Sequence, residues 1–350
     1  MRSKGRAPLR AAQYVGDRTV RTERLDPLEP AEGQVQITVA YTGLCGTDLH
    51  IVHGNMDARV DRPLVFGHEM SGTVAATGPG VTTVSPGDRV TVMPLDWDGT
   101  CPACLAGHQH LCHHLNFIGI DSPGSLQELW TVPEQVVVRL PDGASLRHAA
   151  LVEPVAVAAH DVRRSELTAG DKVVVLGGGP IGVLIATVAR HAGAEVCVSE
   201  VDPTRLQQVE ALGFRTLNAA QEDVESVVTE WTSGAGADVV FEVSGAPAAV
   251  LAATALAKVR GTIVVVAIHP TPRPLDLQRV FWRELRILGA RVYEREDFDR
   301  AVQLIVDGVI PAEELITDVV PLEATADAFA RLEAGTAMKM LVAVQDGAAS

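Results

Sequence analysis

The chain has 350 residues, 47% of them hydrophobic, which is enough material for two domains of ordinary size. Its 29 lysines and arginines stand against 44 aspartates and glutamates, and the resulting net charge of −15 disfavours nucleic acids and anionic membranes as partners. No apolar run reaches the roughly 18–20 residues that a membrane-spanning helix needs, so we expect a soluble protein that handles neutral small molecules or cofactors.

The N-terminal segment 1–6 is basic but no apolar stretch follows it, so we expect a short extension and not a signal peptide. In the first 150 residues, short runs alternate apolar and polar side chains, and the clearest of them predict strands at 35–40, 72–75 and 88–92. Glycine and proline separate these runs. Short strands at irregular spacing predict a distorted barrel or sandwich.

Near Glu153 the pattern changes to alternating strands and helices. Residues 154–164 predict a helix with Pro154 in its first turn, where proline is tolerated. Helical segments, the clearest at 181–191, separate most of the strands predicted at 172–176, 195–199, 238–243, 262–268 and 286–288. This order is typical of a parallel sheet with helices on both faces. Beyond residue 289 we expect helices at 297–306 and 324–333, and a last strand at 339–344 that rejoins the first domain.

A glycine-rich turn follows the first strand of this α/β region. Gly177, Gly179 and Gly182 form the pattern GxGxxG, with Pro180 and Ile181 inside it, and the turn opens a predicted helix. In this context the first glycine allows the tight turn, the second lets the backbone approach a pyrophosphate, and the third lets helix and strand pack closely. The turn therefore predicts a dinucleotide site, with an ordinary strand-to-helix turn as the alternative.

The second strand of the region ends in Glu200, where a carboxylate can bind the 2′-hydroxyl of a ribose. A carboxylate there would repel a 2′-phosphate, so NAD is favoured over NADP. Arg205 lies five residues further on. It can be interpreted either as a partner for a cofactor phosphate or as a solvated helix residue.

Two sets of metal-ligand residues occur in the first domain. Cys45 and His68 offer a thiolate and an imidazole, which suit zinc. Three of the five cysteines lie within twelve residues, which is metal-like spacing and a poor disulfide framework, and a reduced chain of this kind is expected in the cytoplasm. The cysteines of the chain are Cys45, Cys101, Cys104, Cys112 and Cys197.

The ordered set of motifs resembles the zinc-dependent medium-chain alcohol dehydrogenase family, in the branch that holds sorbitol, threonine and butanediol dehydrogenases. The matching motifs are GLCGTDLH at 43–50, GHE at 67–69, the cysteine-rich segment at 98–112, VEP at 152–154 and GGGPIG at 177–182. The resemblance implies a GroES-like β-rich catalytic domain at 1–155 and 290–350, and a Rossmann NAD-binding domain at 156–289. It also implies a reversible oxidation of a secondary alcohol to a ketone, with NAD and a catalytic zinc.

The resemblance assigns roles to single residues. Cys45 and His68 would bind the catalytic zinc, with either Glu69 or Glu153 as the third protein ligand and the other near the zinc-bound water. The proton relay of the family, which runs through a hydroxyl side chain and the nicotinamide ribose to a histidine near solvent, falls on Thr47 and His50. Asp48 matches the residue expected to orient the ligand histidine.

The family also carries a lobe of four cysteines that holds a structural zinc. In this chain the four positions are Asp98, Cys101, Cys104 and Cys112, so a carboxylate replaces the first thiolate. Three thiolates and one carboxylate can bind zinc, although more weakly than four thiolates. An empty lobe that is held by packing alone is the alternative.

The substrate is the least determined part of the prediction. Ile51 and Val292 stand where sorbitol-type enzymes carry an aromatic residue and an arginine, which argues against sorbitol and leaves a vicinal diol, a cyclic polyol or an amino alcohol. L-threonine-type and butanediol-type dehydrogenases remain alternatives. The pocket candidates are His53, Trp97, Phe117 and Tyr293.

Two other classes of function are compatible with this fold. A zinc-independent NADPH reductase of enones or quinones would lack the cysteine and histidine ligands and carry a basic residue in place of Glu200. A non-catalytic binding protein would have lost the ligands or the relay. Neither loss is seen. The family is usually oligomeric through the edge strands of its Rossmann domain, so we expect a homodimer or homotetramer.

Overall fold

The computed structural model describes residues 7–335 and 337–346, and the basic N-terminal segment 1–6 lies outside this range. The chain divides into two compact units. The first contains the described residues up to Glu153, then Glu294–Gly308, and those from Ala312 onward. The second contains Pro154–Tyr293 and Val309–Pro311. No helix of the described residues is long and apolar enough to cross a membrane.

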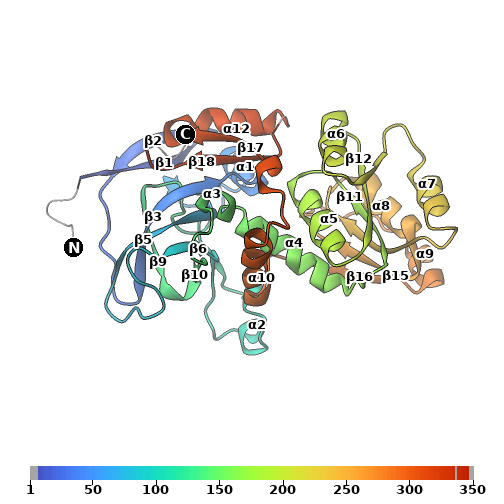
Figure 1. Ribbon diagram of the computed structural model, residues 1–350, viewed down its shortest axis with the longest axis horizontal. Helices are drawn as coiled ribbons and strands as arrows, with labels where there is room; N and C mark the ends of the chain where they lie inside the picture. The colour runs from blue at the N-terminus through green and yellow to red at the C-terminus, as the bar shows by residue number, and fades with distance from the viewer. Residues whose placement is uncertain (1–6, 336, 347–350) are drawn as a thin grey trace. The chain divides into compact units, whose positions relative to one another are not determined.

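The first unit is rich in β-structure, as predicted. Its main sheet has the order β10-β6-β5-β3-β18-β17, with β9 also paired to β3, and the smaller sheets are β2-β1-β4 and β7-β8. Figure 1 shows the last strand, β18, beside β3 from the start of the chain, and the two pair antiparallel. The strands are β1 (Leu9–Gly16), β2 (Thr19–Leu25), β3 (Gln34–Gly43), β4 (Leu64–Val65), β5 (Glu69–Thr77), β6 (Arg89–Val92), β7 (Leu95–Asp96), β8 (Asn116–Phe117), β9 (Leu129–Pro133), β10 (Val137–Arg139), β17 (Ile316–Pro321) and β18 (Lys339–Ala343).

The helices of this unit range from four residues to the twelve of α10. They are α1 (Gly46–Val52), α2 (Pro102–Leu105), α3 (Leu146–Ala149), α10 (Arg295–Val306), α11 (Ala312–Leu315) and α12 (Thr325–Glu333), with 3-10 turns at Gln109–Leu111, Glu134–Val136 and Leu322–Ala324. Helix α4 (Val152–Ser165) begins in this unit and continues into the second.

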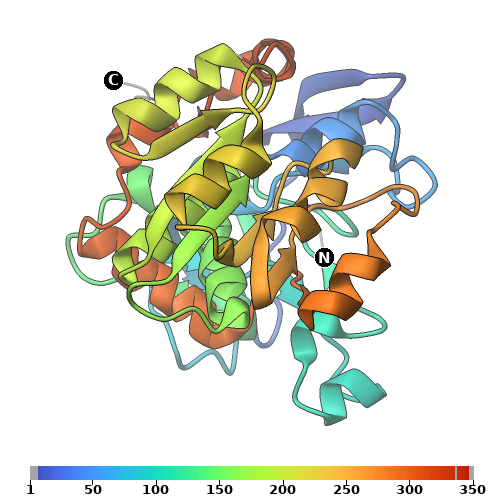
Figure 2. The ribbon, with the colours of Figure 1, turned by 90° about the vertical axis from the view of Figure 1, so that its right-hand side faces the viewer.

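The second unit is a six-stranded parallel sheet with the order β13-β12-β11-β14-β15-β16. The order reverses at β11, so right-handed crossovers place α5 and α6 on one face and α8 on the other. Figure 2 shows this unit towards the viewer. Its elements are β11 (Lys172–Leu176), α5 (Pro180–His191), β12 (Glu195–Glu200), α6 (Pro203–Ala211), β13 (Arg215–Asn218), α7 (Val224–Trp231), β14 (Ala237–Glu242), α8 (Pro247–Leu256), β15 (Ala257–Val265), α9 (Leu277–Arg283) and β16 (Arg286–Gly289).

The core of the second unit is built from the inner strands. Val174, Cys197, Val240 and Ile263 are all at most 1% exposed and pack in one cluster. Burial raises the pKa of the Cys197 thiol to about 12, so this cysteine is an inert core residue. The strand predicted at 262–268 differs from the structure: β15 begins at Ala257 and ends at Val265, and Ile268 beyond it is exposed. Strand β13 was not predicted.

Candidate metal centre and cofactor turn

Helix α1 fixes the first metal-ligand candidate. Cys45 is its N-cap, and the Cys45 sulfur accepts a hydrogen bond from the Thr47 amide at 3.5 Å. Asp48 returns the contact, since its Oδ2 accepts the Cys45 amide at 2.9 Å, and this closes a capping box. The sulfur therefore has a fixed position at the start of the helix.

Two glycines make room for the other candidates. Gly67 has φ +95°, a conformation that favours glycine, and a Cβ there would lie 2.9 Å from the Thr42 methyl carbon. The chain then places His68 and, at the start of β5, Glu69. On the neighbouring strand a Cβ on Gly43 would lie 2.2 Å from Glu69 Oε2, so only glycine admits this carboxylate.

Cys45, His68 and Glu69 converge. One donor atom from each lies within 4.8 Å of those of the other two, and His68 and Glu69 are almost fully buried. Asp48 Oδ1 stands 3.5 Å from His68 Nδ1, as expected for a residue that orients the ring. Burial opposes a charge on His68, but the Asp48 carboxylate and the Cys45 sulfur outweigh it and raise its pKa well above the usual value. A thiolate, an imidazole and a carboxylate with space between them fit a zinc ion.

Lys339 is a functional residue that sequence reasoning missed. Its side chain on β18 is 7% exposed, forms an ion pair with Glu69 and donates a hydrogen bond to the Leu44 carbonyl at 3.1 Å. Burial lowers the pKa of this amine, but the negative groups around it, Glu69 first, raise it overall. The signal was available, because a lysine that begins an otherwise apolar strand and is buried with it must find a partner.

The structure separates the two carboxylates that sequence reasoning left open. Glu69 belongs to the cluster with Cys45 and His68, whereas Glu153, on α4, does not. Glu153 is nevertheless buried, and its charge contributes to the raised pKa of Lys339, so it lies in the surroundings of the cluster.

The relay candidates lie on one face of α1, because Thr47 and His50 are three residues apart in the helix. Thr47 is partly buried and His50 is exposed, where its Nδ1 lies 3.3 Å from the amide nitrogen of Asn55. An inner hydroxyl and an outer imidazole can pass a proton from a buried site to water.

The residues predicted to line the substrate pocket lie in different parts of the structure. Phe117 packs the edge of its ring against His68, with ring centroids 5.3 Å apart, and Ile51 is a fully buried residue of α1. His53 pairs with Glu333 at 3.1 Å, and Trp97 packs against the cysteine lobe. In the second unit Tyr293 is fully buried, and the preceding Val292 has φ +48°, which is rare for a β-branched residue.

The cysteine lobe forms a second cluster. Donor atoms of Asp98, Cys101, Cys104 and Cys112 all lie within 4.8 Å of one another. Backbone amides point at two of the sulfurs: the His113 amide donates to Cys101 at 3.4 Å, and the Asp98 amide to Cys112 at 3.5 Å. Asp98 accepts two backbone amides on one oxygen, and its other oxygen is 2.6 Å from His114 Nδ1. The lobe thus has the donor set of a metal site, with Asp98 in the place of the missing cysteine.

The glycine turn has the geometry of a phosphate site. Gly177 has φ +119°, and a Cβ on Gly182 would lie 1.9 Å from the Gly177 carbonyl oxygen, so both positions need glycine. Gly179 is the N-cap of α5, Pro180 occupies its first turn and Ile181 follows. Backbone amides at a helix N-terminus can bind an anion there.

Glu200 lies against this turn. Its carboxylate accepts the Gly178 amide at 2.8 Å and the amides of Val201 and Asp202 at 2.6 and 3.0 Å. Arg205 Nη1 is 3.9 Å from Glu200 Oε2, so the arginine forms an ion pair with this acid. The turn, the acid and the arginine, predicted from separate segments, are neighbours.

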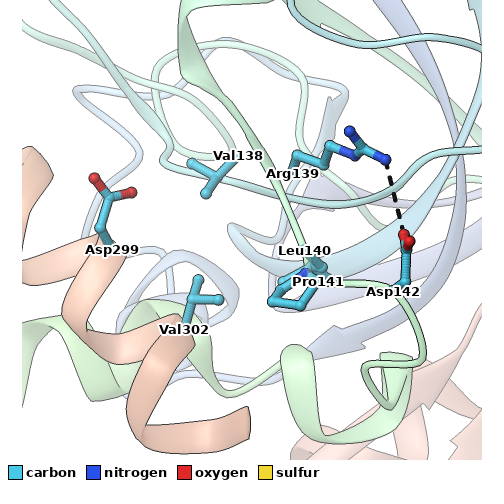
Figure 3. A pocket seen from close by; sticks show the side chains of 7 residues that line it. All are labelled: Val138, Arg139, Leu140, Pro141, Asp142, Asp299 and Val302. Carbon is cyan, nitrogen blue, oxygen red and sulfur yellow. Dashed lines mark ion pairs between the residues drawn. The ribbon is translucent and has the colours of Figure 1, made fainter.

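A surface hollow on the first unit lies between β10 and α10 (Figure 3). It shares no residue with either metal-ligand cluster and contains no cysteine or histidine. Its charged groups include Arg139 and Asp142, which are 3.7 Å apart. The hollow therefore offers no donor set comparable with the cluster around Cys45.

Comparison with known proteins agrees with this arrangement. Residues 31–142 match the alcohol dehydrogenase GroES-like domain, and residues 180–307 match the zinc-binding dehydrogenase domain. The chain is 49% identical to the 2-dehydro-3-deoxy-L-galactonate 5-dehydrogenase of Pseudoalteromonas atlantica, over 95% of this chain and 98% of the relative.

Solved structures give the same result. The 2R,3R-butanediol dehydrogenase of Bacillus subtilis has a TM-score of 0.90 and 32% identity, covering 96% of this chain and 100% of that one. A zinc-binding dehydrogenase of Sinorhizobium meliloti, bound to NADP, has a TM-score of 0.91 and 31% identity, covering 97% and 100%. These matches confirm the predicted GroES-like and Rossmann folds. The chain belongs to the zinc-dependent medium-chain dehydrogenase family, and it is an oxidoreductase that uses a nicotinamide cofactor.

Proposed function

We propose that this protein oxidises a secondary alcohol to a ketone with NAD, at a zinc ion held by Cys45, His68 and Glu69. The observation that carries the proposal is the convergence of these three donors within 4.8 Å of one another, with His68 and Glu69 buried. Zinc, when bound, supplies the Lewis acidity that lowers the pKa of a hydroxyl group. Glu69 is favoured over Glu153 as the third ligand because only Glu69 belongs to the cluster.

The other residues around the cluster position and neutralise its parts. Asp48 holds the His68 ring, and Lys339 balances the charge of Glu69. Thr47 takes the hydroxyl proton and His50 delivers it to water, since they lie on one face of α1 with His50 outermost. Glu153 is assigned to the surroundings, where its charge acts on Lys339.

We assign the cofactor as NAD. Glu200 places a negative charge beside the glycine turn, where the 2′-phosphate of NADP would be repelled. Arg205 is the residue that argues for NADP, but it is already close to Glu200, which offsets its charge. The pyrophosphate would lie at the turn of Gly177, Gly179, Pro180, Ile181 and Gly182.

We further propose that the lobe of Asp98, Cys101, Cys104 and Cys112 holds a structural zinc. The amide that His113 directs at the Cys101 sulfur lowers the pKa of that thiol, and the contacts on Asp98 hold its carboxylate in the fourth position. The five cysteines are free thiols, which supports a reducing, cytoplasmic location.

The substrate we favour is an acidic polyol, a 2-keto-3-deoxy sugar acid of the kind named for the Pseudoalteromonas atlantica relative. Identity of 49% over almost the full length of both chains is well above the 32% shared with the butanediol dehydrogenase. The acidic composition alone pointed to neutral small molecules, so this assignment needs a local positive charge in the pocket.

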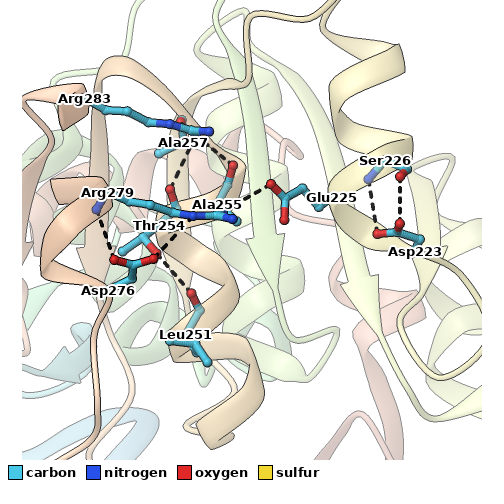
Figure 4. A network of polar contacts seen from close by, with 10 residues as sticks. All are labelled: Asp223, Glu225, Ser226, Leu251, Thr254, Ala255, Ala257, Asp276, Arg279 and Arg283. Atoms are coloured by element: carbon cyan, nitrogen blue, oxygen red, sulfur yellow. Dashed lines mark hydrogen bonds and ion pairs between the residues drawn. The ribbon is translucent and has the colours of Figure 1, made fainter.

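We propose that the protein forms a homodimer through α9 and β16. Among the described residues β16 is paired on one side only, by β15. Leu277, Phe281 and Trp282 on α9 are each at least 70% exposed. Arginines of the same helix bind the protein body instead (Figure 4): Arg283 donates to the carbonyls at the end of α8, including Ala257 at 2.7 Å, and Arg279 pairs with Glu225 on α7 at 3.1 Å.

The arginines of α9 face the protein body and its large apolar side chains face outward. An exposed apolar patch of this kind is typical of a surface that a partner covers. A second copy is the simplest occupant, because an open edge strand pairs readily with its own symmetry mate. A tetramer would need a second contact surface in addition.

The decisive experiment is a substrate panel with metal control. Purified protein is assayed for NADH formation with 2-dehydro-3-deoxy-L-galactonate, 2R,3R-butanediol and sorbitol, and with NAD against NADP. Chelator-treated wild type and the Cys45→Ser variant should both bind NAD but lose turnover. Added zinc should restore turnover to the chelated wild type and not to Cys45→Ser. Full activity without zinc would refute the metal mechanism, and inactivity of the zinc-loaded protein on every alcohol would refute the assigned reaction.

A further inference from the structure

We propose that Arg59 binds the carboxylate of the sugar-acid substrate and so selects acidic over neutral polyols. The inference rests on the proposed function, because it names the group that recognises the acid end of that substrate. It concerns specificity and leaves the chemistry at the zinc ligands unchanged.

The guanidinium of Arg59 is fixed by one of its edges. Its Nε donates to Asp121 Oδ1 at 2.6 Å, and its Nη2 donates to Asp121 Oδ2 at 2.7 Å. The hydrogen bonds to Asp121 also raise the pKa of Arg59, which secures its charge. No protein group in the described part of the chain is bonded to Nη1, and the side chain is 46% exposed. The terminal edge, Nη1 with Nη2, can therefore receive a carboxylate in the bidentate geometry that guanidinium groups favour.

The pair stands one residue away from the metal cluster. Asp121 Oδ2 also accepts the Phe117 amide at 2.9 Å, in a turn that the Asp121 amide closes onto the Phe117 carbonyl. The Phe117 ring packs edge-on against His68. A continuous set of contacts thus links Arg59 through Asp121 and Phe117 to His68, which we assign as a zinc ligand.

The chemistry of the substrate calls for a cation that can receive its carboxylate. In a 5-dehydrogenase of a galactonate the reacting carbon and the acid carbon are four bonds apart, about 5 Å in an extended chain. A chain of net charge −15 repels a carboxylate unless a cation is positioned to receive it. Lys339 is buried and paired with Glu69, so its charge is already neutralised.

Arg62 provides a matched control. It lies three residues further in the same segment, is similarly exposed at 41%, and is also paired with an aspartate, Asp57, at 2.9 Å. Its Nη1 is the atom that makes this bond, and it lies against Gly16 of β1. Replacement of Arg62 removes the same charge from the surface without touching the Phe117 turn.

The test compares Arg59→Gln, Arg59→Lys and Arg62→Gln with the zinc-loaded wild type. Each is assayed on 2-dehydro-3-deoxy-L-galactonate, on 2R,3R-butanediol and on a polyol phosphate, and thermal melting checks folding. Arg59→Gln should raise KM for the sugar acid by about 10- to 100-fold, the loss expected for a charged bidentate contact, with kcat and the diol activity little changed. Arg59→Lys should recover part of the affinity, and Arg62→Gln should behave as wild type.

Four results would overturn the inference. If Arg59→Gln weakened the diol and the sugar acid equally, Arg59 would be structural; if Arg62→Gln matched it, the effect would be general surface charge. If the wild type preferred the polyol phosphate, the recognised anion would not be a carboxylate. If the wild type oxidised butanediol but not the sugar acid, the inference about Arg59 would fail and the proposed alcohol oxidation would still hold. Inactivity on every alcohol would refute both the inference and the proposed oxidation.

Discussion

Replacement of Lys339 by methionine tests the charge balance of the metal cluster most directly. Methionine fills a similar volume but leaves Glu69, which is 1% exposed, without its ion pair, and it also removes the hydrogen bond to the Leu44 carbonyl. Loss of one partner of a buried ion pair costs about 3–5 kcal/mol. For a unit of this size that corresponds to a fall of about 6–20 °C in melting temperature.

The size of the effect should depend on zinc. In the zinc-loaded protein the cation takes over the neutralisation of Glu69, so Lys339→Met should destabilise the loaded form by less than the chelated form. Differential scanning calorimetry of both forms measures this difference. Lys258→Met is the control, because Lys258 also pairs with a carboxylate, that of Asp238, but is 40% exposed and should change stability by less than about 1 kcal/mol. Equal losses with and without zinc, or no loss in the chelated form, would show that Lys339 does not balance Glu69.

Three other predictions test separate parts of the molecule. Glu200→Gln should narrow the preference for NAD over NADP by about tenfold, since it removes a charge worth about 1.4 kcal/mol beside the turn; an unchanged ratio of kcat/KM values would contradict the cofactor assignment. Metal analysis after dialysis should find about one zinc ion per chain in Asp98→Ala and two in the wild type and in Asp98→Cys. If Asp98→Ala held as much zinc as the wild type, the Asp98 carboxylate would not be a ligand. Phe281→Asp should convert the proposed dimer to a monomer, as measured by light scattering, and the monomer should still oxidise the alcohol substrate. A persistent dimer would place the interface elsewhere.

The fold was predictable wherever hydrophobic periodicity was strong. The parallel sheet of the second unit was found because its inner strands are apolar on both faces. Strand β2 was missed because none of its residues is buried, and only its pairing with β1 makes it a strand. Helix α9 was missed for a related reason: its arginines face the body and its apolar residues face out, so its pattern is the reverse of an ordinary surface helix.

The residues of the candidate site were predictable, but the choice between acids was not. The motif around residues 67–69 and the acid at 153 both suggested a ligand, and spacing along the chain has no information on which one reaches the sulfur. That is decided by Gly43 on β3, which leaves the space that the Glu69 carboxylate fills. The role of Lys339 could not be predicted for the same reason. Its partner, Glu69, lies 270 positions earlier in the chain, and the two meet only because β18 packs beside β3.

These contacts explain why the site is suited to a divalent cation. Near Cys45 the fold buries the acids Glu69, Asp48 and Glu153, and it buries the amine of Lys339 with them. Burial of acids without compensating charge costs several kcal/mol each, and the raised pKa of His68 reflects the same shortage of positive charge. A proton on His68 offsets part of it, but the proton occupies the nitrogen lone pair that a metal would use. A bound zinc ion would replace that proton with two charges and leave the ring neutral, so the buried negative charges favour the binding of a divalent cation.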